Sequence, residues 1–364
     1  MELDAASQNA LENYQYRTDC RSVMYPSLKR FWYQPVLNLF PYWHANIYTL
    51  LAFFCSCFAF ISCLLFVVYP SAPWLLALAG ALFWGYNTLD NIDGVQARRT
   101  GTSGPIGEIF DHGLDAVSVF YLPLGIAYAL GVSSDVVLIL VSVVSLACWT
   151  TMWELYYSGE MVTGALSDVE GVVFSSLFLV AGGILGAQVV NAGLFGSSIS
   201  FTDLMVFLAL GGAAVQIVMP IWRVKKLHLQ IQFLVPLLVQ LALIGTYYFT
   251  GKKVPVLPLA ILMGICASFG TVFCILDRLY KRPIKMIEPI SVVMAVLTCA
   301  AIGLEPHLQG HLTTVLWGLI GLSMLLYYIT MHRNIAAISR FLGIHVFTLT
   351  PEQKEQLKEV LKKG

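Results

Sequence analysis

The chain has 364 residues, of which 58% are hydrophobic and only 12% are charged. Its 21 basic and 21 acidic side chains cancel, so no net positive field supports nucleic acid as a partner. Long apolar runs without strand-like alternation predict an all-α polytopic integral membrane protein, because a helix pairs its own backbone groups inside hydrocarbon. The eight cysteines lack zinc-ligand spacing and are expected to be small buried residues.

Residues 1–45 are predicted to form an N-terminal cytosolic and interfacial segment. Its stretch "YPSLKRFWYQPVLNLFPYW" mixes aromatic, basic and aliphatic residues. This mixture is typical of an amphipathic segment lying in the headgroup layer, or of a simple aromatic belt.

Residues 46–332 form the predicted transmembrane domain, with about ten helices of roughly 20 residues each. In chain order, the expected spans are 46–69, 72–93, 107–131, 134–158, 171–191, 202–222, 230–250, 255–278, 287–304 and 311–332. An even number of crossings places both termini on one side. Arg98 and Arg99 follow the second span, and Arg278 ends the eighth, so this side is predicted to face the cytosol.

Residues 333–364 are the predicted C-terminal cytosolic tail. Thr350, Pro351 and Gln353 follow the pattern of an N-cap, a proline at the first helical position and a capping box. This pattern predicts a short solvated helix beginning at residue 351.

The end of the second span carries acidic residues that a membrane helix ordinarily excludes. Asp90, Asp93, Gly94 and Ala97 are spaced i, i+3, i+4 and i+7, which places them on one helical face. Ionisable residues inside a membrane segment indicate function by default.

The start of the third span repeats this arrangement. Gly107, Asp111 and Asp115 are four residues apart and therefore share one face. The intervening "RTGTSGP" contains turn residues that reverse the chain. Together the two faces predict four carboxylates converging at the cytosolic edge of the membrane.

Four clustered carboxylates need compensating positive charge, because both burial and mutual repulsion oppose their ionisation. Oxygen ligands select hard cations, so Mg²⁺ or Mn²⁺ is expected rather than zinc. Four aspartates suffice for two ions, an arrangement suited to phosphoryl transfer. Arg98 adds a fixed cation suited to phosphate.

The stretch resembles the CDP-alcohol phosphotransferase family, whose signature is DxxDGxxARx₈GxxxDxxxD. Within that family it is most similar to the eukaryotic choline and ethanolamine phosphotransferases, as are "WELYYSG" at 153–159, "DVEG" at 168–171 and "YYITMHRNIAAISRFLGIHVFTL" at 327–349. The residues that match the signature are Asp90, Asp93, Gly94, Ala97, Arg98, Gly107, Asp111 and Asp115.

The resemblance implies a reaction. The hydroxyl of a diacylglycerol or alkyl-acylglycerol attacks the phosphorus of CDP-choline or CDP-ethanolamine that carries the alcohol, and CMP leaves. The implied metal ligands are Asp90, Asp93, Asp111 and Asp115. The implied CDP-alcohol-binding residues are Asn46, Asp90, Gly94, Ala97, Arg98 and Gly107.

Three residues are candidates for the general base that removes the lipid hydroxyl proton: His112, then Glu154, then Asp115. Glu154 is also a candidate to orient His112 or relay its proton. The alternatives are a structural hydrogen bond for His112 and an interfacial position for Glu154.

The sequence also suggests roles for Asn46, Trp153 and Tyr156. Asn46 is predicted either to reach the nucleotide or to cap its helix, since the family often has Pro-Asn where this chain has Ala45 before Asn46. Trp153 and Tyr156 are candidates to contact the headgroup, and an aromatic cage would favour choline.

Two other functions fit parts of the pattern. An aspartate-rich intramembrane prenyltransferase also binds a diphosphate through Mg²⁺, and "DHGLD" alone suits it. A cation-coupled transporter would use a carboxylate ion site, but such sites lie near the bilayer midplane. The family resemblance further implies an endoplasmic reticulum or Golgi enzyme, a cytosolic active site and a homodimer.

Overall fold

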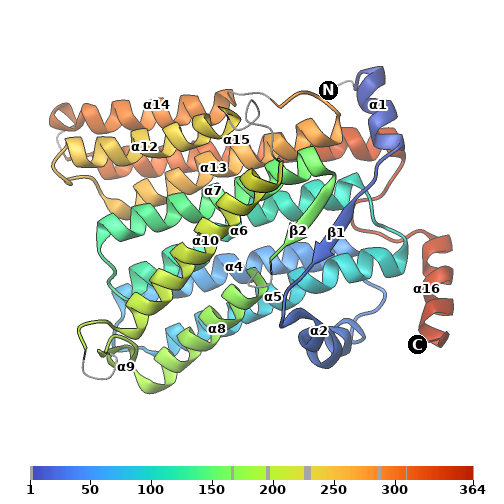
Figure 1. Cartoon of the computed structure of the whole chain (residues 1–364), viewed down its shortest axis with the longest axis horizontal. Coiled ribbons are helices and arrows are strands. Elements are labelled where there is room, and N and C mark those ends of the chain that lie inside the picture. The colour runs from blue at the N-terminus through green and yellow to red at the C-terminus, as the bar shows by residue number, and fades with distance from the viewer. Residues whose placement is uncertain are drawn as a thin grey trace.

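The computed structural model describes residues 3–164, 168–193, 197–224, 231–284, 288–308 and 310–363. Its long helices lie side by side along the longest axis of the molecule (Figure 1). In the described ranges these helices are α4 (Ala45–Val68), α5 (Trp74–Thr100), α6 (Pro105–Ala129), α7 (Ser134–Ser158), α8 (Asp168–Leu185), α10 (Phe201–Val224), α12 (Leu234–Phe249), α13 (Val256–Leu279), α14 (Pro289–Gly303) and α15 (Leu312–Leu342).

Each expected span corresponds to one of these helices, and the all-α polytopic membrane fold is confirmed. Six of the described helices are long and apolar enough to cross a membrane, namely α4, α7, α8, α10, α13 and α15. Two more, α12 and α14, are apolar but shorter. Helices α5 and α6 complete the bundle and carry the aspartates. Residues 230 and 287, at the ends of two expected spans, lie outside the described ranges.

The last long helix differs from the expectation. Helix α15 continues for ten residues past residue 332 and ends at Leu342. Gly343 then closes it in the left-handed conformation, with a φ of 66°. The predicted start of the tail at residue 333 therefore falls inside a helix, because "RNIAAISRFL" continues the helical pattern beyond the apolar stretch.

Shorter elements cover the end of the bundle that carries both chain ends. In chain order they include α1 (Ala5–Glu12), β1 (Arg17–Cys20), α2 (Tyr25–Leu28), η1 (Lys29–Tyr33), α3 (Gln34–Leu37), β2 (Glu160–Thr163) and α16 (Pro351–Lys363). The capping box of α16 is present: the Thr350 N–H donates to Gln353 Oε1 at 2.9 Å, and the Gln353 N–H donates to Thr350 Oγ1 at 3.3 Å. The small elements α9 (Ala187–Val190), η3 (Ile231–Phe233) and η4 (Glu305–His307) lie between long helices.

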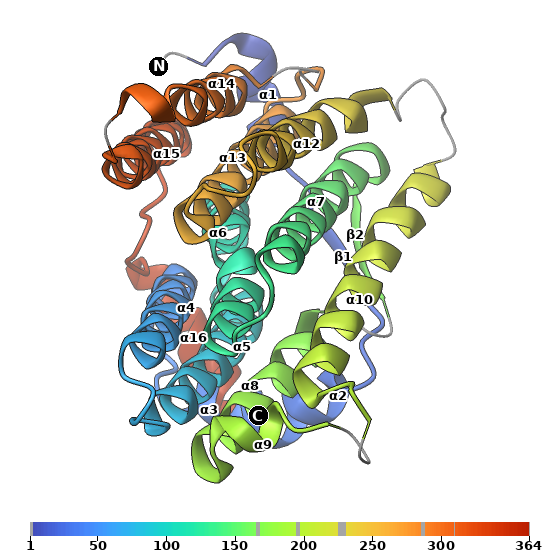
Figure 2. The same cartoon turned by 90° about the vertical axis from the view of Figure 1, so that its left-hand side faces the viewer.

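The centre of the bundle is α13, which packs against α6, α7, α14 and α15 (Figure 2). Most of its side chains are buried. Helices α10 and α15 instead expose large apolar side chains such as Phe207 and Tyr328, which is the pattern expected where lipid replaces water.

Helices α5 and α6 are joined by a tight turn but then separate. Gly101 ends α5 with a φ of 66°, and Pro105 is the first residue of α6. Beyond the turn, α5 packs mainly against α4 and α8, whereas α6 packs against α4, α7 and α13. The backbones of α5 and α6 are therefore close mainly near the turn, and farther from it only longer side chains such as Tyr86 and Asp115 bridge the two helices.

Candidate active site

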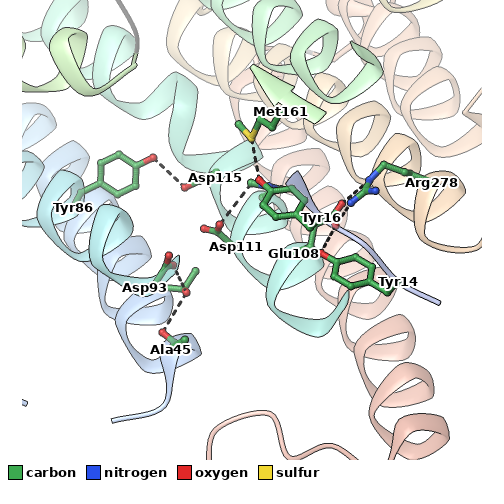
Figure 3. Close-up of polar contacts among 12 residues, drawn as sticks. Tyr14, Tyr16, Ala45, Tyr86, Asp93, Glu108, Asp111, Asp115, Met161 and Arg278 are labelled. Atoms are coloured by element: carbon green, nitrogen blue, oxygen red, sulfur yellow. Dashed lines mark hydrogen bonds and ion pairs between the residues drawn. The ribbon is translucent and has the colours of Figure 1, made fainter. Parts of the chain in front are cut away.

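Four aspartates converge from the facing sides of α5 and α6, as the spacing predicted. Carboxylate oxygens of Asp90, Asp93 and Asp111 lie within 4.8 Å of one another, and so do ligand atoms of Asp111, His112 and Asp115. Asp111 belongs to both groups, so the cluster is continuous across the two helices. Figure 3 shows the side chains of Asp93, Asp111 and Asp115 gathered between the two ribbons.

Neighbouring helices hold two of these carboxylates by hydrogen bonds that the sequence alone did not indicate. Thr49 of α4 donates its hydroxyl to Asp93 Oδ2 at 2.5 Å. Tyr86, one turn before Asp90 on α5, donates to Asp115 Oδ1 at 3.0 Å. These bonds aim the carboxylates but do not neutralise them.

The residues fit a divalent cation. In the described part of the chain, no Lys or Arg makes an ion pair with any of the four aspartates. Asp111 Oδ1 is buried and has no hydrogen-bond partner. A buried carboxylate oxygen without a partner is costly, and a hard cation is the partner that an all-oxygen set prefers.

The small residues of the signature face open space. A Cβ added to Gly94 would meet only the Arg98 guanidinium at 3.5 Å, and one added to Gly107 would meet only Asn46 Oδ1 at 4.0 Å. Packing within the chain therefore does not require glycine at either position. A ligand approaching both backbones would require it. Ala97, on the same face of α5, is half-buried, and the Arg98 side chain is exposed beside it.

Asn46 does not cap its helix. The cap of α4 is His44, whose Nδ1 accepts the Asn46 N–H at 3.2 Å. The Asn46 side chain is buried and donates to the Val346 carbonyl at 2.8 Å. Its Oδ1 lies beside Gly107, so Asn46 joins the region predicted for the nucleotide.

His112 lies next to the cluster and contacts a residue from the N-terminal segment. Its Nδ1 is 3.7 Å from Asp111 Oδ2, and its Nε2 is 3.1 Å from the Tyr16 hydroxyl. The same hydroxyl donates to Met161 Sδ at 3.1 Å (Figure 3). Neither Tyr16 nor Met161 was predicted, because no local pattern signals a contact across 96 or 145 positions.

A buried ion pair lies one turn before His112. Glu108 pairs with Arg278 of α13, and Tyr14 donates its hydroxyl to Glu108 Oε2 at 2.7 Å. The Arg278 guanidinium also lies 5.8 Å from the ring centres of both Tyr14 and Tyr16. Burial raises the pKa of both tyrosine hydroxyls, and nearby carboxylates raise the pKa values further. Both hydroxyls therefore remain protonated at physiological pH.

Glu154 has a different environment from the one predicted. Both of its oxygens accept hydrogen bonds from Arg223 of α10, at 2.5 Å and 2.8 Å. Within the described residues, no contact joins Glu154 to His112. A bidentate arginine partner stabilises the ionised carboxylate and leaves it poorly placed to relay a proton from His112.

The two headgroup candidates also have other partners. Trp153 is buried and donates its indole N–H to Gln232 Oε1 at 3.1 Å. Tyr156 donates to the Arg282 carbonyl at 2.7 Å. Neither makes a described contact with the carboxylate cluster, so their headgroup role stays a prediction.

The fold and this site define a class: a multi-pass membrane protein with an acidic centre formed by two neighbouring helices. Residues 42–180 match the family model described as CDP-alcohol phosphatidyltransferase.

Several relatives carry more specific names. Cholinephosphotransferase 1 of Gallus gallus is 32% identical over 194 residues, covering 51% of this chain and 57% of that protein. Ethanolaminephosphotransferase 1 of Mus musculus is 34% identical over 174 residues, covering 43% of this chain and 42% of that protein. The chain thus aligns with about half the length of these two relatives.

Another relative aligns along nearly the whole chain. A Dictyostelium discoideum protein of the CDP-alcohol phosphatidyltransferase class-I family is 26% identical over 356 residues, covering 93% of this chain and 86% of that protein. The similarity therefore extends beyond the segment that contains the aspartates.

Proposed function

We propose that the chain transfers phosphocholine or phosphoethanolamine from a CDP-alcohol to the hydroxyl of a diradylglycerol. The lipid oxygen forms a bond to the phosphorus that carries the alcohol. The bond between this phosphorus and the bridging oxygen of the diphosphate breaks, and CMP leaves. The products are CMP, one proton and phosphatidylcholine or phosphatidylethanolamine, or their ether-linked counterparts.

The observation that carries this proposal is the meeting of the two acidic groups at Asp111, on helices that also bear the open glycines and Arg98. A nucleoside diphosphate needs both a cation site and room beside backbone. A prenyltransferase also needs the cation site, but its substrate does not explain the half of the signature that runs from Gly94 to Arg98. The acids lie in the half of α5 and the half of α6 that adjoin the turn between these helices, which also disfavours the transporter.

Asp90, Asp93, Asp111 and Asp115 would hold Mg²⁺ or Mn²⁺, and four carboxylates suffice for two ions. When bound, these ions supply positive charge that offsets the charge developing on the diphosphate. Thr49 and Tyr86 keep two of the four carboxylates aimed at the site. Arg98, Asn46 and Gly107 border the space in which the nucleotide would lie.

His112 is the proposed general base. It is buried beside Asp111 and points Nδ1 toward the cluster, so a lipid hydroxyl bound at the cluster lies within reach of that nitrogen. Asp115 remains the alternative on the same helix, although it already accepts a hydrogen bond from Tyr86. Glu154 is the weakest of the three because Arg223 engages both of its oxygens.

The position of the site suits substrates of opposite solubility. The helix ends of α5, α13 and α15 that carry basic residues lie at the same end of the bundle as the turn between α5 and α6 (Figure 1). By the positive-inside rule this end faces the cytosol, which supplies the nucleotide, while the bilayer supplies the lipid. The proposed setting is the endoplasmic reticulum or Golgi membrane, with the chain acting as a homodimer.

An assay of purified protein with each CDP-alcohol and a diradylglycerol tests the proposal. We expect CMP release and phospholipid formation in equal amounts, only when Mg²⁺ or Mn²⁺ is present. CMP release with one CDP-alcohol alone would assign the headgroup. Turnover of a prenyl diphosphate, with none of either CDP-alcohol, would overturn the proposal.

A further inference from the structure

The N-terminal segment packs against the candidate active site. Strand β1 pairs in parallel with β2, and this pairing places Thr18 opposite Met161. Tyr14 and Tyr16 of this segment reach Glu108 and His112 of α6, although they lie nearly 100 positions before them. Figure 3 shows Tyr16 standing between Met161 and the α6 ribbon.

Two buried carboxylates anchor this segment on either side of Tyr16. On one side, Tyr14 donates to Glu108, which is paired with Arg278. On the other side, Glu170 Oε1 of α8 accepts from the Ser22 hydroxyl at 2.5 Å and from the Met24 N–H at 2.9 Å. Charge-assisted hydrogen bonds to buried carboxylates are among the stronger anchors available. The position of Tyr16 is thus determined by both flanks.

The Tyr16 hydroxyl contacts both Met161 Sδ and His112 Nε2, and which of the two atoms donates at Nε2 depends on the tautomer of the ring. A phenol has one proton to donate, and a thioether sulfur can only accept. The Tyr16 hydroxyl donates to Met161 Sδ, so toward His112 Nε2 its oxygen is left to accept. With this donor assignment, Nε2 bears the imidazole proton and Nδ1, beside Asp111, bears the free lone pair.

We propose that Tyr16, held by Met161 and the β1–β2 pair, is a positioning residue that fixes the ring orientation and tautomer of His112. This inference rests on the proposed function, in which Nδ1 of His112 accepts the lipid hydroxyl proton. The imidazolium formed by that transfer keeps its Nε2–H donated to the tyrosine oxygen. Tyr16 itself neither gains nor loses a proton and does not touch the substrate.

The test compares two tyrosines on the same segment. Tyr16→Phe keeps the ring but removes the hydroxyl from His112, whereas Tyr14→Phe removes a hydroxyl that contacts Glu108 instead. We expect Tyr16→Phe to lower kcat roughly tenfold or more, as loss of a tautomer-setting partner does, with KM for the CDP-alcohol nearly unchanged. Tyr14→Phe is expected to lower the apparent melting temperature and to affect kcat much less.

A second variant, and the same substitution made in a His112→Ala protein, distinguish a positioning role of Tyr16 from an effect on folding. Met161→Leu keeps the volume but removes the sulfur acceptor, and we expect a smaller kcat loss in the same direction. In a His112→Ala background, Tyr16→Phe should cause no further loss, because the group it positions is gone. Binding of the CDP-alcohol in the absence of acceptor lipid should be unchanged in each variant.

The outcomes distinguish this inference from the proposed function. Wild-type kcat in Tyr16→Phe, or an equal loss in both backgrounds, overturns the positioning role and leaves the phosphotransferase proposal intact. Full turnover by His112→Ala instead overturns the base assignment and, with it, the inference. Failure to turn over either CDP-alcohol is a failure of the proposed function itself.

Discussion

Two sets of buried or half-buried carboxylates lie on the helices of this bundle, and they differ in their partners. Glu108 and Glu154 are each paired with an arginine, Arg278 and Arg223, from another helix. Among the described residues, Asp90, Asp93, Asp111 and Asp115 have no such cation, and only Asp93 and Asp115 accept a hydrogen bond from a hydroxyl group. Carboxylates inside a membrane bundle therefore have two uses. A carboxylate paired with an arginine joins two helices, whereas a cluster of carboxylates without a basic partner can bind a ligand.

The first prediction concerns the ions that the unpaired set would hold. Removal of divalent ions with a chelator should lower CMP release to background, and Mg²⁺ or Mn²⁺ should restore it. Asp111→Asn should lose turnover by roughly 10²-fold or more, because Asp111 belongs to both acidic groups. CMP release is the measurement.

Stability provides the control for this variant. An amide at position 111 removes like-charge repulsion, so the apparent melting temperature of metal-free protein should not fall. Undiminished turnover in the chelated enzyme would contradict the role assigned to the cluster.

The second prediction concerns His112. His112→Ala should lower kcat by roughly 10²- to 10⁴-fold, the range typical of a lost general base, while binding of the CDP-alcohol persists. Binding is measured directly, without acceptor lipid. Loss of binding together with turnover would indicate a structural role for His112 instead.

The third prediction concerns the paired set. Glu108→Gln leaves Arg278 buried without its counter-ion and should cost about 3–5 kcal/mol of stability. The Glu108 side chain is only 1% exposed and that of Arg278 only 12%, so water cannot replace the lost partner. The apparent melting temperature in detergent measures the effect. An unchanged value would mean that the pair is not a structural anchor.

The fourth prediction separates Glu154 from the catalytic candidates. Glu154→Gln should destabilise the protein by about 3 kcal/mol, near the lower end of that range, because Arg223 is 28% exposed and regains some water. Turnover per folded molecule should stay near that of the unchanged protein. A kcat loss as large as that of His112→Ala would return Glu154 to the mechanism.

The fifth prediction is the smallest. Lys252 donates to Asp135 at 2.7 Å in an exposed ion pair between α7 and the loop before α13. Because water competes for both groups, Asp135→Asn should leave the apparent melting temperature unchanged within error. A clear decrease would show that exposure is a poor guide to which pairs matter in this bundle.

The local sequence pattern was sufficient to predict the helices and their acidic faces. Apolar runs predicted the helices of the bundle, since each must pair its own backbone in lipid. The spacing of Asp90, Asp93, Asp111 and Asp115 predicted their convergence, because helical periodicity and a short turn act within 26 residues. The α16 cap followed from Thr350 and Gln353 for the same reason.

Partners far apart in the sequence were decided by the tertiary structure alone. Glu108 finds Arg278 across 170 positions, Glu154 finds Arg223 across 69, and Tyr16 finds His112 across 96. No local period encodes such pairings, because they depend on which helices pack side by side. The sequence by itself therefore determined where the acids lie along the chain. Only the packing of α6, α7, α10 and α13 decided which acids are neutralised by arginine and which are left for a ligand.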